Sequence, residues 1–136
     1  KARSMTVKPG AADSAIFADP TQKQKDIYNL HYKKAGLVFV PSVKGAGSRM
    51  QRMSLTRDRL AATSDAALNN KPMEEPGLFI ASNCTQAIKQ IPLLKRDEKN
   101  AEEVDTDQED HLYDEMSYQF LNYETHGGMM SVWLAW

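Results

Sequence analysis

The chain has 136 residues, 41% of them hydrophobic and 26% charged, which is typical of one globular domain. Its longest apolar runs, residues 36–41 and 129–136, fall well short of the roughly 18–20 residues of a membrane span, so we expect no membrane partner. The single cysteine, Cys84, excludes an internal disulfide and a zinc site built from several thiolates. No apolar stretch follows the basic start at residues 1–6, and we therefore expect a cytoplasmic protein.

The net charge of −1 hides a strong asymmetry between the two halves of the chain. Residues 1–72 carry 13 basic and 5 acidic side chains, whereas residues 73–136 carry 4 basic and 13 acidic ones. A basic half beside an acidic half is typical of a protein that holds a polyanion with one surface and cations with another. The alternative is that both sets of charges are solvated faces that serve solubility.

The first 41 residues predict a strand, a helix and a second strand. A short strand, or its end, is expected within residues 11–17, and Asp19-Pro20-Thr21 has the composition of a helix start. Gly36 would end that helix, and the β-branched and aromatic run 37–40 predicts a buried strand before Pro41. This order is typical of a crossover unit, in which a helix joins two parallel strands.

The remaining chain repeats the alternation of helices and short strands. We expect a helix from Ser48 to about residue 61 with its methionines and leucine on one side and its arginines mostly elsewhere. The other expected elements are a polar loop at 63–76, a strand at 77–80, a helix from Asn83, an exposed acidic loop at 95–108, a helix at 109–123 and an apolar tail at 127–136. The predicted class is therefore α/β, with a small, mainly parallel sheet flanked by helices.

The last predicted helix carries the clearest cluster of chemically useful side chains. Asp110, His111, Asp114 and Tyr118 gather on the side away from the apolar stripe, and His111 and Asp114 are neighbours at i, i+3. Carboxylate oxygens on adjacent turns can supply part of a site for a hard divalent cation. Alternatively, these acids are a solvated first turn favoured by the helix dipole.

Two further candidates lie in the basic half. Asp13 is an acid inside an apolar stretch and could reach a ligand from a strand end, or serve only as a cap. Lys44 lies in the glycine-flanked segment 43–49, whose amides could approach a phosphate, although the spacing differs from a Walker loop. A plain basic loop is the alternative.

Several segments, in this order, resemble the C-terminal nuclease domain of the large subunit of tailed-phage terminase, the motor that packages and cuts viral DNA. The matching stretches cover most of residues 9–122: Pro9-Gly10-Ala11-Ala12-Asp13-Ser14, Val43-Lys44-Gly45-Ala46-Gly47-Ser48-Arg49, Gly77-Leu78-Phe79-Ile80 with Asn83-Cys84, and Val104-Asp105-Thr106 with Glu109-Asp110-His111 and Asp114. Each stretch is short, and the set in sequence carries the resemblance.

The resemblance implies a ribonuclease H-like fold with an acidic cluster that binds two Mg²⁺ or Mn²⁺ ions about 4 Å apart for phosphodiester hydrolysis. It implies that Asp13 and Asp114 are catalytic metal ligands, that Asp110 adds a ligand, and that His111 ligates metal or orients a ligand or water. Basic residues would hold double-stranded DNA through its backbone: Lys44, Arg49, Arg52 and Lys71. Further partners would be the small terminase subunit, the portal or the ATPase domain, in the cytoplasm of the host cell.

Two departures from the family pattern limit this interpretation. Nothing upstream of Asp13 supplies the family's first catalytic aspartate, and Ser117 stands where an arginine often precedes the tyrosine. We therefore expect residues 1–136 to form one nuclease-like domain, a partial ribonuclease H-like fragment without the ATPase domain and the first strands. The alternative is a non-catalytic module, such as a prophage remnant, that binds nucleic acid or the packaging complex.

Overall fold

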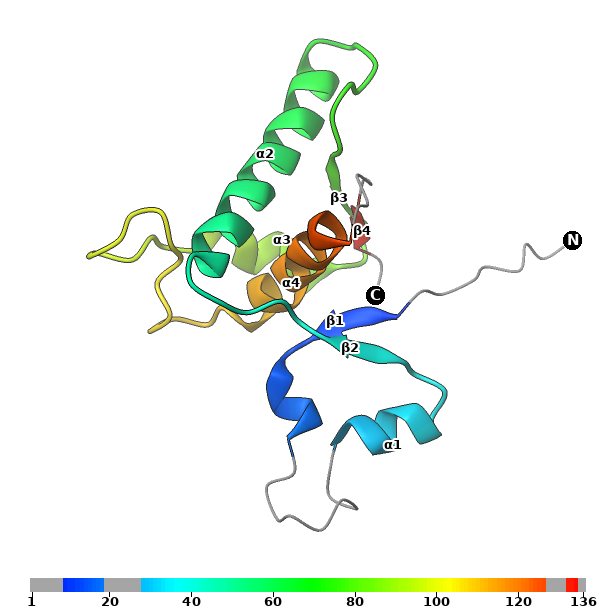
Figure 1. The fold of residues 1–136 in the computed structure, drawn as a ribbon. Helices are drawn as coiled ribbons and strands as arrows, with labels where there is room; N and C mark the ends of the chain where they lie inside the picture. The colour runs from blue at the N-terminus through cyan, green and yellow to red at the C-terminus, as the bar shows by residue number, and fades with distance from the viewer. Residues whose placement is uncertain (1–8, 19–27, 127–131, 135–136) are drawn as a thin grey trace, which may run out of the picture. The chain divides into compact units, whose positions relative to one another are not determined.

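The computed structural model describes residues 9–18, 28–126 and 132–134, and these form two compact units divided after Ser42 (Figure 1). Each unit contains one two-stranded parallel sheet accompanied by helices, so the chain belongs to the mixed α/β class that the sequence predicts. Among the described residues, no helix is long and apolar enough to cross a membrane.

The first unit is the predicted strand–helix–strand crossover. Strand β1 (Gly10–Ala12) pairs in parallel with β2 (Phe39–Pro41), with Ala11 opposite Val40. A short 3₁₀ helix, η1 (Ser14–Phe17), and helix α1 (Tyr28–Lys34) lie between them. The predicted helix start at residues 19–21 lies outside the described residues.

The prediction of a buried strand at residues 37–40 is wrong in its extent and burial. Strand β2 begins two residues later, and the side chains of Leu37 and Val38 are 51% and 54% exposed. Gly36 has a positive φ of 82° and ends the helix, as expected. In the part of this unit that the structure describes, the sheet has two strands, and it offers little surface to bury the whole apolar run.

The second unit is built on two helices that pack against each other, α2 (Ser48–Leu68) and α4 (His111–Thr125) (Figure 1). Between them in the chain lie β3 (Leu78–Ile80), α3 (Thr85–Gln90) and the 3₁₀ helix η2 (Ile91–Leu93). Strand β4 (Val132–Leu134), from the apolar tail, pairs in parallel with β3. The core of the unit is formed by Leu78, Val104, Tyr113, Met116 and Phe120.

Helix α2 differs from its prediction in length and in the face that it buries. It continues through Thr63 to Leu68, because no glycine or proline interrupts this alanine-rich stretch and because hydrogen bonds satisfy the Thr63 hydroxyl. The buried face carries Arg52, Thr56 and Arg59, whereas Met50 and Leu60 are more than one third exposed. Arginine is buried here because α4 supplies a carboxylate for each guanidinium, from Asp114 and from Glu124.

The segment between η2 and α4 is a folded loop anchored at one apolar residue. An antiparallel bridge joins Arg96 to Val104, and the Asp97 carboxylate accepts bonds from the amides of Lys99 and Asn100. These bonds hold the pKa of Asp97 below its ordinary value. Val104 is 8% exposed and belongs to the core, so the acidic loop is fixed against the body of this unit.

Candidate functional site

A pocket of about 410 Å³ opens in the second unit where the first turns of α2 and α4 meet the loop that precedes α4. Its walls combine cationic, acidic and hydroxyl groups. The lining residues are Lys44, Gly45, Ser48, Arg49, Arg52, Val104, Thr106, Asp110, Tyr113, Asp114 and Tyr118.

The basic wall follows from how α2 begins. Gly47 has a φ of 78°, a left-handed conformation that glycine adopts without strain, and it turns the chain into the helix. Arg49 and Arg52 are three positions apart and therefore share one face of the first turns. The Lys44 ammonium lies 5.9 Å from the centre of the Tyr118 ring, so the loop before α2 adds a third cation.

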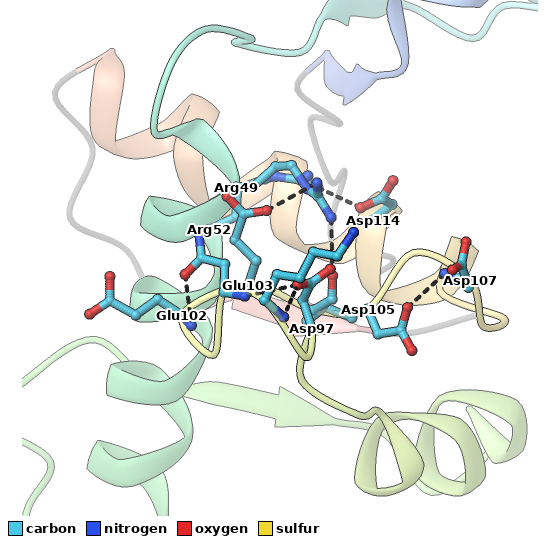
Figure 2. A network of polar contacts seen from close by, with 11 residues as sticks. Arg49, Arg52, Asp97, Glu102, Glu103, Asp105, Asp107 and Asp114 are labelled. Atoms are coloured by element: carbon cyan, nitrogen blue, oxygen red, sulfur yellow. Dashed lines mark hydrogen bonds and ion pairs between the residues drawn. The ribbon is translucent and has the colours of Figure 1, made fainter.

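Arg52 is the most buried cation of the pocket, with a side chain only 7% exposed. Its Nη1 donates to Asp114 Oδ1 at 2.6 Å (Figure 2). The same Nη1 donates to Ser117 Oγ at 2.9 Å. Its guanidinium lies over the Tyr118 ring, 4.5 Å from the ring centre. The Tyr118 hydroxyl in turn donates to Asp114 Oδ2 at 3.2 Å, so both oxygens of this carboxylate are engaged.

Arg49 ties the acidic loop to α2. Its Nη1 lies 3.0 Å from Glu103 Oε2 (Figure 2). Its Nη2 donates to the carbonyl oxygen of Val104 at 3.0 Å. The Arg49 side chain is 41% exposed, so it remains accessible to a ligand from solvent.

The acidic wall consists of Asp110, which precedes α4, and Asp114 one turn later. Partial burial and the negative charge of Asp114 raise the pKa of Asp110 above its ordinary value. The charge of Asp114 therefore disfavours the ionised form of Asp110, a repulsion that a bound cation would relieve.

Tyr113 lies behind the acidic wall with only 5% of its surface exposed. Burial raises the pKa of its phenol. Thr56 and Ser117 lie close to the hydroxyl, but among the described residues none forms a hydrogen bond of good geometry with it. The pocket thus contains a buried polar group that is open to a further interaction.

The carboxylates of Asp110 and Asp114 have the donor chemistry that Mg²⁺ and Mn²⁺ prefer, and Mg²⁺ is commonly held by one or two carboxylates together with water. Within the described residues, no three His, Cys, Asp or Glu side chains gather closely enough to hold a metal ion. Among the described residues of the second unit, Asp110 and Asp114 are therefore the two carboxylates that line the pocket.

The structure brings five of the predicted site residues to one pocket: Lys44, Arg49, Arg52, Asp110 and Asp114. His111 is exposed and does not line it. Lys71 follows the far end of α2, a helix about 30 Å long, and pairs with Asp65 at 2.6 Å. Asp13 belongs to the first unit, where it caps η1 by accepting a bond from the Ala15 amide at 2.7 Å.

Sequence reasoning missed the part that Tyr113 and Ser117 play in the site. Tyr113 lies three positions after Asp110, and Ser117 lies three positions after Asp114, so helical spacing places each close to an acid. Both residues lie on the buried face of the helix, where the sequence pattern predicts only packing. Their place beside the site depends on the burial of Arg52 against this helix, which the sequence does not show.

The chain matches no known protein family, no curated protein and no solved structure. Its function is therefore inferred from the pocket and from the sequence motifs that meet there.

Proposed function

We propose that the chain is a metal-dependent DNA endonuclease domain of the viral terminase type, with a ribonuclease H-like fold, that hydrolyses phosphodiesters with Mg²⁺ or Mn²⁺. The observation that carries the proposal is the pocket in which two carboxylates one helical turn apart, Asp110 and Asp114, face Lys44, Arg49 and Arg52. Two of the motifs that resemble the terminase nuclease, 43–49 and 104–114, supply most of its walls.

Each side of the pocket suits one component of that reaction. Asp110 and Asp114 would hold the metal ion, which when bound activates water and stabilises the charge that develops on the phosphate. Lys44 and Arg49 are accessible cations that would bind backbone phosphates and orient the DNA without reading its sequence. The hydroxyl of Tyr118 and the guanidinium of Arg52 hold the Asp114 carboxylate in one orientation.

Asp13 and His111 have proposed roles that depend on the rest of the active site. Asp13 would act as a metal ligand, as the resemblance implies, and the exposed His111 would ligate metal or orient a ligand or water. Lys71 would contact DNA at a distance from the pocket. The family's first aspartate has no counterpart in these residues, so binding of metal is a more direct test than cleavage.

The test is an amide NMR titration with trace Mn²⁺, whose unpaired electrons broaden nearby resonances. We expect broadening at residues 111–115 together with residues 12–15, and loss of both in Asp114→Asn. Cleavage of supercoiled plasmid with Mg²⁺ or Mn²⁺ is then measured on the same samples. Broadening confined to residues 97–110, with residues 12–15 unaffected, would show diffuse ion binding and overturn the proposal.

One observation favours a second candidate, a non-catalytic module that binds nucleic acid or the packaging complex. Both Asp114 oxygens are already engaged by protein groups, which opposes metal binding, whereas the accessible Lys44 and Arg49 can attract a polyanion without any metal. This module would bind duplex DNA in the presence of EDTA, with an affinity that falls steeply with salt. The nuclease requires the acidic wall for its metal, whereas the module would bind DNA more tightly once Asp110 is neutralised.

A further inference from the structure

The guanidinium of Arg52 is held in place by contacts of two kinds. One is the ion pair with Asp114 at 2.6 Å, which depends on the charge of that carboxylate. The others are the bond to Ser117 Oγ at 2.9 Å and the stacking on the Tyr118 ring at 4.5 Å. These two contacts do not depend on the charge of Asp114. Arg52 can therefore keep its position in the wall of the pocket when Asp114 is engaged by something else.

The Arg52–Asp114 ion pair weakens the binding of a divalent cation without phosphate, and also of a phosphate without a cation. A divalent cation that approaches Asp114 meets the positive charge of Arg52 on Oδ1 and the Tyr118 hydroxyl on Oδ2. A phosphate that approaches Arg52 meets the negative charge of Asp114. If both ligands are present, the cation neutralises the carboxylate and the phosphate neutralises the guanidinium, so each removes the repulsion that the other faces.

We propose that Arg52 couples the two ligands of this pocket: a divalent cation on Asp110 and Asp114 releases Arg52 from Asp114 to a DNA phosphate, so cation and phosphodiester bind cooperatively. This inference rests on the proposed function, since it assigns regulation to the same site. It makes Arg52 a positioning residue whose partner changes with metal occupancy. Arg52 Nε has no hydrogen-bond partner among the described residues, so Asp114 and Ser117 do not exhaust the donors of this side chain.

The coupling is tested by DNA binding without cleavage. Fluorescence anisotropy of a short labelled DNA duplex is followed with EDTA or with Ca²⁺, which binds carboxylates, at constant ionic strength. For the wild-type chain we expect Ca²⁺ to raise DNA affinity at least about fivefold, and DNA to raise Ca²⁺ affinity by the same factor.

The decisive variant is Arg52→Met. In EDTA, Arg52→Met loses no phosphate contact but leaves the charge of Asp114 unpaired in the pocket. In Ca²⁺ it loses the phosphate contact itself, so it should weaken DNA binding clearly more than in EDTA, by about fivefold or more. Lys71→Met, which removes a charge outside the pocket, is the matched control. It should change the DNA affinity by the same factor in EDTA and in Ca²⁺. An Arg52→Met effect of equal size with and without Ca²⁺ would overturn the proposal.

A second pair of variants examines the carboxylate side without metal. Asp114→Asn should release Arg52 and raise DNA affinity in EDTA more than Asp110→Asn does, although each removes one negative charge from the pocket. The difference between the two should vanish in an Arg52→Met background. Equal effects of the two substitutions in the wild-type background would contradict the release of Arg52.

Failure of the coupling and failure of the proposed function give different results. If Mn²⁺ broadens residues 111–115 and Arg52→Met still acts equally in EDTA and Ca²⁺, only the coupling is wrong. If Mn²⁺ broadens none of these resonances and Ca²⁺ changes no variant, both proposals fall. If Arg52→Met does not fold by circular dichroism, Arg52→Gln replaces it: this variant removes the charge but keeps a polar side chain, and an effect of equal size in EDTA and Ca²⁺ would likewise overturn the coupling.

Discussion

The hydroxyl of Thr63 bonds to the main chain of Leu78, accepting from its amide at 2.9 Å and lying 3.0 Å from its carbonyl oxygen. Leu78 opens strand β3 and pairs with Val132 of β4 in the sheet register. The Thr63 side chain of α2 thus bonds to both main-chain polar groups of Leu78, as the backbone of a neighbouring strand would. This connection joins the helix that carries Arg52 to the core strand of the second unit.

Removal of this hydroxyl should cost stability, because it leaves the amide of Leu78 without that partner in a buried position. We expect Thr63→Val, which keeps the shape of the side chain, to lower the free energy of unfolding by about 1–3 kcal/mol. Urea denaturation followed by circular dichroism measures the loss. Thr63→Ser keeps the hydroxyl and should lose clearly less; equal losses for the two variants would show that the bond contributes little.

Gly77 is required by its surroundings rather than by its backbone angles. A Cβ at this position would lie 2.5 Å from both Met73 Sδ and Thr63 Oγ1. The methionine can move, but Thr63 is fixed by its bonds to Leu78, so we expect Gly77→Ala to destabilise the fold by about 1–3 kcal/mol. Gly45→Ala is the matched control, because no atom lies within 4 Å of its Cβ, and thermal unfolding of the two variants compares them. Similar melting temperatures for both would contradict the clash.

How far the sequence predicts the structure depends on which interactions decide each element. Local signals sufficed for the crossover in the first unit, the start of α2 at Ser48 and the strand near Leu78. The orientation of α2 could not be predicted, because its buried arginines are determined by Asp114 and Glu124, more than sixty residues away. Hydrophobic periodicity predicts that the arginines of a helix are exposed to solvent. Arg52 and Arg59 are buried because each pairs with a carboxylate of α4.

In the candidate site, too, the sequence predicted the features that depend on local signals and not those that depend on tertiary contacts. The acids of α4 and the basic segment before α2 were identifiable from composition and spacing, and the structure places them in one pocket. The sequence did not predict that Asp114 is paired with Arg52 or that Ser117 accepts from the same guanidinium. Those contacts depend on the packing of α2 against α4, which no local pattern specifies.

The Arg52–Asp114 pair should contribute more to stability than the exposed pair of Lys71 and Asp65 at the end of α2. In a double-mutant cycle of Arg52→Met and Asp114→Asn, we expect a coupling free energy of about 1–3 kcal/mol, measured by urea unfolding in EDTA. The low exposure of Arg52 protects the pair from water and salt, whereas Lys71 and Asp65 are 47% and 53% exposed. The control cycle of Lys71→Met and Asp65→Asn should give less than about 1 kcal/mol. Equal coupling in the two cycles would show that burial of Arg52 adds nothing.

The acidic wall should make the stability of the metal-free protein depend on pH. The pKa of Asp110 is raised above its ordinary value of 3.8, first by burial and then by the charge of Asp114. The stabilisation that comes from the protonated carboxyl is therefore fully present below 3.8 and is lost as the pH rises through the higher pKa of the folded state. At neutral pH the ionised Asp110 lowers the stability of the fold.

Asp110→Asn should remove this cost while keeping a residue suited to the start of a helix. We expect the variant to exceed the wild-type chain in thermal stability at neutral pH in EDTA, by less than about 1 kcal/mol because solvent screens the partly exposed site. The advantage should shrink as the pH is lowered toward 3.8, because the wild-type carboxyl then becomes neutral as well. Glu109→Gln, at the exposed neighbouring position, controls for a general loss of negative charge. An advantage of Asp110→Asn that stays constant across this pH range would contradict the proposed repulsion between Asp110 and Asp114.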